Sequence, residues 1–149
     1  MSRRICGKAL FLIIIMCMVK GSAAIAGEDV SLNVEVVYAS SERVYVDPTL
    51  VSLKKKLSRL FNYSSFEIVS NITRRAVKGE TAEFVIPGGR VMKIALLETG
   101  KVRARLNVQI FEKNRGFLST VLRMERGSLV MVGGPSYHKG VLIIVISAR

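Results

Sequence analysis

The chain has 149 residues, a formal net charge of +12 at pH 7, and a composition that is 50% hydrophobic. This length suffices for one domain with its own hydrophobic core. The basic balance indicates either simple solubility or an anionic partner, but the absence of tryptophan and the scattered aromatic residues argue against a base-stacking surface for nucleic acid.

The first segment has the layout of a secretory signal peptide. Three basic residues precede an apolar run at 9–19, and small residues follow, with Ala24 and Ala26 in an A-x-A arrangement. The run is shorter than the roughly 20 residues that cross a membrane, so we expect cleavage after Ala26; an uncleaved anchor is the alternative. The sequence predicts a signal peptide at 1–26, a single β-rich domain at 27–149 without a transmembrane segment, and export to the periplasm or cell envelope.

Cysteine and charge are distributed unevenly between these two parts. Both cysteines, Cys6 and Cys17, fall in the leader, so the expected mature domain has no disulfide, thiolate metal site or cysteine nucleophile. The leader also holds four of the 23 basic residues and none of the 11 acidic ones, which leaves the mature domain with a net charge of +8. Such a domain must be stabilised by its core alone.

A strand followed by a helix opens the mature domain. Apolar residues alternate along 29–40, which predicts a half-buried strand. Asp47 and Pro48 then form a helix start, and the predicted helix extends to Phe61. Its apolar stripe consists of Leu50, Leu53, Leu57, Leu60 and Phe61, and Lys55, Lys56 and Arg59 lie on the far side. A basic helix lying on a membrane is one interpretation; we favour a helix that covers a sheet, because so many strands follow.

Seven further strand candidates follow the helix, with turn signals between them. The candidate at 141–146 is apolar at every position, which predicts a central strand covered on both faces. The candidates lie at 66–77, 81–86, 90–98, 101–112, 117–125, 128–132 and 140–147. The sequence therefore predicts a mainly β fold, an antiparallel β-sandwich or small open barrel of about seven to eight strands with one covering α-helix.

Two glycine pairs could each form either a phosphate-binding loop or a turn between strands. Gly133 and Gly134 follow a strand, as a phosphate-binding loop would, but no helix can begin after Pro135 and no Walker lysine follows at the required offset. We therefore predict a hairpin connection with positive φ at Gly133 and Gly134, and another at Gly88 and Gly89.

Residues suited to catalysis are sparse in the expected mature domain. His138 is the only histidine and has no cysteine or second histidine with which to share a metal. No Gly-x-Ser-x-Gly elbow and no grouped acidic pair occur. We expect no enzyme activity, no catalytic residue, no metal site and no cofactor; a hydrolase with an unfamiliar site is the alternative.

Two segments near the end resemble a known family. "TVLRMERGSLVMVGGP" (120–135) is similar to a strand–turn–strand phrase in the membrane-gate domain of bacterial secretins, and "VLIIVISAR" (141–149) is similar to a later apolar strand there. Pro135 departs from the leucine that usually ends the secretin phrase. The mature chain also resembles small exported bacterial proteins of unassigned function that carry a helix, "PGGR" and "VGGP" in this order. These resemblances imply a β-rich exported protein and no activity.

Function is therefore expected in binding rather than in chemistry. The leading hypothesis is a non-enzymatic interaction module of the bacterial cell envelope, for example an accessory of a secretion or surface assembly, with an envelope protein or an anionic surface as partner. Two basic features could form its contact face, or simply be solvated: Arg103 and Arg105 on one strand, and Lys55, Lys56 and Arg59 on the helix. The alternative is a periplasmic binder of a small or anionic ligand in a sheet–helix cavity.

Overall fold

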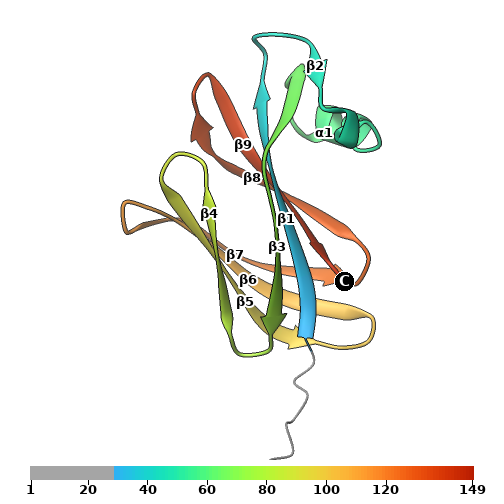
Figure 1. Ribbon diagram of the computed structural model, residues 1–149, viewed down its shortest axis with the longest axis vertical. Coiled ribbons are helices and arrows are strands. Elements are labelled where there is room, and N and C mark those ends of the chain that lie inside the picture. The colour runs from blue at the N-terminus through green and yellow to red at the C-terminus, as the bar shows by residue number, and fades with distance from the viewer. Residues whose placement is uncertain (1–28) are drawn as a thin grey trace, which may run out of the picture.

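The computed structural model describes residues 29–149, so the predicted signal peptide at 1–26 lies outside the described residues. Nine strands form two sheets that pack face to face, and one short helix lies against the outer side of one sheet (Figure 1). The elements are β1 (Asp29–Ser40), β2 (Tyr45–Val46), a 3₁₀ turn η1 (Pro48–Leu50), α1 (Lys54–Leu60), β3 (Ser65–Val77), β4 (Thr81–Ile86), β5 (Arg90–Thr99), β6 (Arg103–Glu112), β7 (Arg115–Glu125), β8 (Leu129–Tyr137) and β9 (Gly140–Ala148). The predicted mainly β fold with one helix is confirmed.

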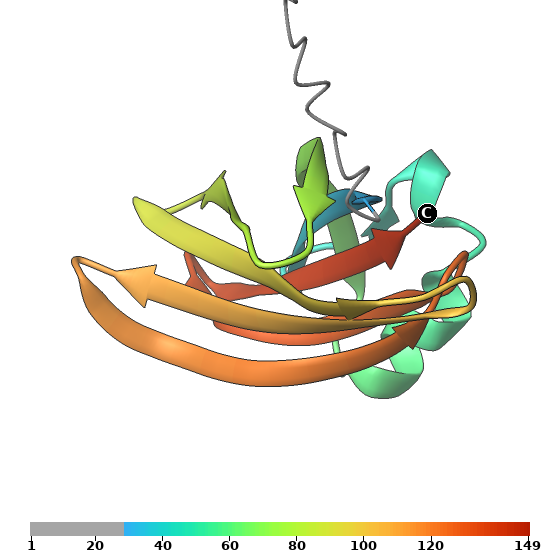
Figure 2. The same cartoon turned by 90° about the horizontal axis from the view of Figure 1, so that it is seen from below.

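The two sheets differ in how far apart in the sequence their paired strands lie. Sheet B is a meander with the order β4-β5-β6-β7, in which each strand pairs with its neighbour in the chain. Sheet A has the order β2-β3-β1-β9-β8, so the first and last strands of the described chain lie next to each other. All pairings between strands are antiparallel except that of β2 with β3. Figure 2 shows β6 and β7 running side by side along a common curve.

The main core fills the space between the two sheets. Strands β1 and β6 bury alternate apolar residues there, as their period of two requires. Strand β9 lies between β1 and β8 and is covered on both faces. Its residues Leu142, Ile144 and Ile146 face sheet B, whereas Ile143 and Val145 belong to a second cluster under α1. The predicted central position of the 141–146 strand is thus confirmed.

The predicted continuous helix from 48 to 61 is wrong in its extent. Asp47 caps as expected, because its Oδ1 atom accepts hydrogen bonds from the Thr49 amide (2.9 Å) and hydroxyl (2.6 Å). The first turn is nevertheless 3₁₀, and α1 proper has seven residues. A 3₁₀ segment turns faster per residue than an α-helix, so the apolar stripe drifts out of phase. Leu57 is fully buried, whereas Leu60, which was predicted in the same stripe, is 57% exposed.

The predicted turn at Gly133 and Gly134 is also wrong. Both glycines lie inside β8, where the pairing with β9 is irregular between Gly133 and Ser136. Neither has a positive φ; the turn instead follows Tyr137, with His138 at φ 48°. A Cβ atom on Gly134 would lie 2.8 Å from the Leu142 carbonyl oxygen, so this glycine permits a close approach between strands rather than a reversal. By contrast, Gly88 and Gly89 do lie in the β4–β5 turn with positive φ.

A buried arginine ties the two glycine pairs together. The Arg90 side chain, which is only 11% exposed, forms an ion pair of 2.7 Å with Glu112. It also donates hydrogen bonds to the carbonyl oxygens of Pro87 and Ser136. The turn of sheet B that contains Gly88 is thereby attached to the irregular end of β8 in sheet A.

Candidate functional site

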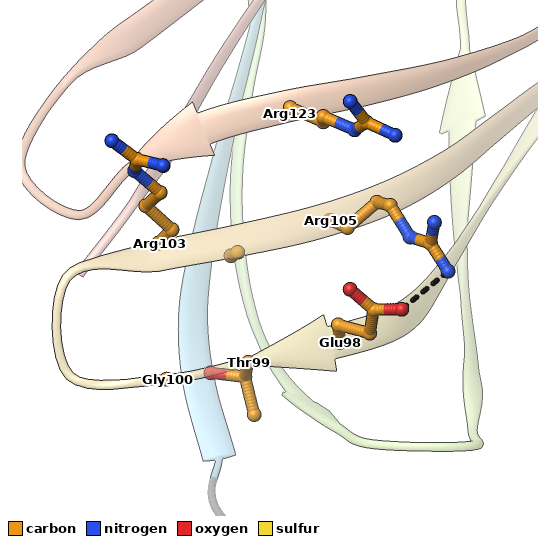
Figure 3. A pocket seen from close by; sticks show the side chains of 7 residues that line it. Glu98, Thr99, Gly100, Arg103, Arg105 and Arg123 are labelled. Carbon is orange, nitrogen blue, oxygen red and sulfur yellow. Dashed lines mark ion pairs between the residues drawn. The ribbon is translucent and has the colours of Figure 1, made fainter.

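The outer face of sheet B carries a cluster of arginines near the β5–β6 loop. Arg103 and Arg105 lie on β6, and Arg123 lies on the neighbouring strand β7. Ala104 and Met124 alternate with them and are buried in the core, so the arginine side chains must point to the opposite, solvent side. We call Arg103, Arg105 and Arg123, together with Glu98 on β5, the arginine face (Figure 3).

Cross-strand pairing places two cations directly opposite each other. Arg105 is the register partner of Arg123, and Arg103 is the partner of Glu125. Arg105 forms an ion pair with Glu98, with Nη2 2.5 Å from Oε1. Within residues 29–149, neither Arg103 nor Arg123 forms an ion pair. The face therefore has more positive than negative charge at close range.

The arginine face surrounds a shallow hollow of ≈410 Å³. Its lining consists of Glu98, Thr99, Gly100, Arg103, Ala104, Arg105 and Arg123. Arg103 and Arg123 line the hollow and form no ion pair within the described residues, so these two guanidiniums have donors available there. Guanidinium groups bind carboxylates through two parallel hydrogen bonds. The hollow is thus suited to carboxylate side chains.

Only part of this site was predictable. Arg103 and Arg105 were predicted on one strand face, but Arg123 was not singled out. Strand alternation around the turn at 113–116 could have suggested it, because a hairpin brings the far half of β7 beside β6. The pairing is irregular between Ile110 and Phe111, which shifts the register by one residue and hides the match from simple counting.

The second predicted basic feature lies elsewhere. Lys55, Lys56 and Arg59 are exposed on α1, which covers the outer side of sheet A. The arginine face lies on the outer side of sheet B, so the sandwich separates the two groups of cations. They cannot act on one small ligand together.

The layer between α1 and sheet A is filled by side chains. Leu50, Leu57, Phe66 and Ile143 are fully buried in it. An open hollow of ≈410 Å³ lies at its margin. The lining there consists of Leu60, Phe61, Asn62, Tyr63, Gly133, Gly134 and Val141. The predicted sheet–helix cavity thus corresponds to a shallow marginal hollow.

The remaining residues that could bind metal or titrate make contacts typical of structural residues. Within the described residues, no three His, Cys, Asp or Glu side chains cluster as metal ligands would. His138 lies against Tyr137, with ring centroids 4.2 Å apart. Hydrogen bonding to the Glu42 carboxylate raises the pKa of Lys139 above its ordinary value, which is the behaviour of a surface ion pair. No helix among residues 29–149 has the length and apolar content needed to cross a membrane.

Comparison with known proteins gives one faint structural neighbour. No family model matches the chain, and no curated protein matches it. Among solved structures, the chain is similar to the T2SS secretin XcpQ from Pseudomonas aeruginosa, at 10% sequence identity and a TM-score of 0.39. The similar region covers 81% of this chain and 56% of that one.

Proposed function

We propose that this chain is an exported, non-enzymatic interaction module of the bacterial cell envelope. It docks an acidic segment of a partner protein on the arginine face. The observation that carries this proposal is the direct opposition of Arg105 and Arg123 across β6 and β7. The proposal of export rests on the leader pattern at 1–26. More specifically, we propose that the module is an accessory of a secretion or surface assembly.

The opposed arginines repel each other, and an acidic partner can remove this repulsion. Like charges directly opposite each other on neighbouring strands are unfavourable. The Arg105–Arg123 opposition itself adds nothing to folding, and Glu98 pairs with Arg105 alone. A carboxylate placed between the two guanidiniums turns the repulsion into two attractions. Electrostatic complementarity of this kind increases association rates and partner selectivity.

The filled layer under α1 favours docking over transport of a small ligand. A carrier needs a cavity that encloses most of its ligand, whereas buried side chains occupy the space between helix and sheet. The arginine face is open and shallow, which fits a protein segment better than a small molecule. The basic net charge of the chain acts in the same direction.

The test compares two charge-matched triple variants. In one, Arg103, Arg105 and Arg123 are replaced by Glu; in the other, Lys55, Lys56 and Arg59 are replaced by Glu. Both variants change the net charge equally, so only the location differs. The probes are an immobilised glutamate-rich peptide and vesicles that contain an anionic phospholipid, each at low and high salt. Circular dichroism tests whether both variants retain the β fold.

We expect the peptide to bind the wild type and the helix variant, with affinity that falls as salt rises. The arginine-face variant should lose at least tenfold in affinity. Equal losses in both variants would show that net charge alone matters, and would remove the proposed site. Binding to the vesicles but not to the peptide would contradict a protein partner.

A further inference from the structure

We infer that the partner segment binds as an added β-strand along the free edge of β7, next to the arginine face. This inference rests on the proposed function and specifies the shape of its partner. Strand β7 ends sheet B and pairs only with β6. Its backbone therefore presents an unpaired row of N–H and C=O groups on the other side. An extended peptide can complete that row with main-chain hydrogen bonds.

The other sheet margins are protected in familiar ways. Strand β2 has two residues and β4 has six, which leaves little backbone to pair. Strand β8 contains Pro135 inside an irregular stretch. Strand β3 skips Val69 in its pairing with β1 and is therefore bulged. Short strands, prolines and bulges are the devices by which natural sheets prevent edge-to-edge association.

Strand β7 lacks these devices along most of its length. Its pairing with β6 skips Phe117 near the start and is then regular from Leu118 to Glu125. It contains neither proline nor lysine. Val121 in the middle of this stretch is 54% exposed and Phe117 is 49% exposed. A long, regular edge with apolar residues that face solvent is typical of a strand that has a partner.

The side chains of β7 specify what the added strand should contain. On the outer face, Arg123 would lie opposite one residue of the partner, at a cross-strand distance that suits an ion pair. On the inner face, the partly buried Leu118 and Leu122 pack at the margin of the core. The partner segment therefore alternates, with acidic residues on one face and apolar residues on the other.

Charge distinguishes this partner from a second copy of the chain. Pairing of β7 with β7 of another copy would bring two arginine faces onto one continuous sheet surface. Each face already holds three arginines against Glu98 and the exposed Glu125 opposite Arg103, and each chain is strongly basic. An acidic segment complements this surface, whereas a second copy repeats its charge.

Backbone methylation tests strand addition directly. The probe is a short peptide in which valine and glutamate alternate. One version is N-methylated at every valine and another at every glutamate. Because N–H groups alternate sides along a strand, one version loses the hydrogen bonds to β7 and the other loses only those that face solvent. A peptide with glutamine in place of glutamate controls for charge.

We expect the unmodified peptide to bind the chain and one methylated version to lose more than tenfold in affinity, while the other binds nearly normally. Hydrogen exchange should show new protection of every second amide in 118–125. No binding at millimolar peptide, equal behaviour of the two methylated versions, or protection on a different strand would overturn the inference. If the chain self-associates and β7 becomes protected at the same time, the inference would also be overturned, because the partner strand would then come from a second copy.

The two proposals fail in different ways. If the glutamate peptide binds, loses affinity with the arginine-face variant, and tolerates both methylation patterns, then the acidic partner stands and strand addition fails. If the glutamine peptide binds as well as the glutamate peptide while only one methylation pattern is tolerated, then strand addition stands and the role of the arginine face fails.

Discussion

The Nη2 atom of Arg90 lies 3.1 Å from the carbonyl oxygen of Ser136 and donates a hydrogen bond to it. This contact joins the first residue of β5 in sheet B to the irregular end of β8 in sheet A. Backbone irregularity leaves carbonyl groups without strand partners, and the long guanidinium supplies the missing donor. The same group neutralises Glu112, so one side chain stabilises three separate segments.

Replacement of Arg90 by Ala should lower the free energy of unfolding by about 2 kcal/mol, because buried acceptors lose their donors and Glu112 loses its partner. Urea denaturation measures the change. Arg43→Ala, which removes an exposed ion pair with Glu67, is the control and should cost less than about 1 kcal/mol. Similar losses in the two variants would show that the Arg90 contacts do not hold the sheets together.

Replacement of Gly140 by Ala should destabilise the fold by about 3 kcal/mol, since overpacking of a tight contact forces backbone movement. A Cβ atom at this position would overlap the carbonyl oxygen of Ala39 in the neighbouring strand β1. Gly116→Ala is the control, because its Cβ would meet no atom within 4 Å and its φ is not positive. Its effect should stay within about 0.5 kcal/mol. Equal thermal midpoints for both variants would contradict the close approach.

Two leucines of the same short helix should respond differently to truncation. Leu57→Ala should cost about 3 kcal/mol, because it removes a fully buried side chain from the cluster under α1. Leu60→Ala should cost less than about 0.5 kcal/mol, because Leu60 is mostly exposed. Denaturant titration separates the two outcomes. A large effect at Leu60 would restore the longer apolar stripe that the sequence predicts.

The cap at Asp47 should make part of the stability dependent on pH. Hydrogen bonds from the Thr49 hydroxyl and then the Thr49 amide lower the pKa of the Asp47 carboxyl below its ordinary value of 3.8. A lowered native pKa means that the cap stabilises the fold fully above ~pH 5 and loses this effect as the pH falls through the native pKa. The stability gap between wild type and Asp47→Ala should therefore narrow at acidic pH.

Asp47→Asn is the matched control for this experiment. Asparagine also caps helices but carries no charge, so its gap from Asp47→Ala should not vary with pH in the same range. Denaturant midpoints measured across an acidic pH series give both gaps. A gap between wild type and Asp47→Ala that stays the same across the pH series would show that ionisation of Asp47 does not stabilise the turn.

Strand positions followed from the sequence because alternation and turn residues are local properties. All eight predicted strands occur, and 141–146 is central because six consecutive apolar residues need cover on both faces. Strand β2 was missed because two residues carry no periodic pattern. The order of strands in sheet A depends on contacts between distant segments, which no local pattern records.

The errors at the helix and at Gly133 have a common cause. In both places the sequence pattern identified a real local feature, a helix cap or a required glycine. Contacts with distant segments then determined the structure that forms around it. The capped start at Asp47 holds, yet the 3₁₀ turn ends before a continuous helix can form. Glycine at 134 is needed, but for proximity to Leu142 rather than for a positive φ. The role of Arg123 likewise depends on register, which the irregularity at Phe111 shifts.

The pairing of β1 with β9 sets the order in which this protein can fold. Sheet B consists of hairpins between successive segments, so its contacts can form as soon as the chain reaches β7. Sheet A cannot close until β9 is present, because β9 separates β1 from β8 and contributes to both hydrophobic clusters. A growing chain therefore keeps both clusters open to water until its final strand is available. We therefore expect sheet B to form early and the two sheets to close late, at a rate limited by the long-range pairing of β1 with β9.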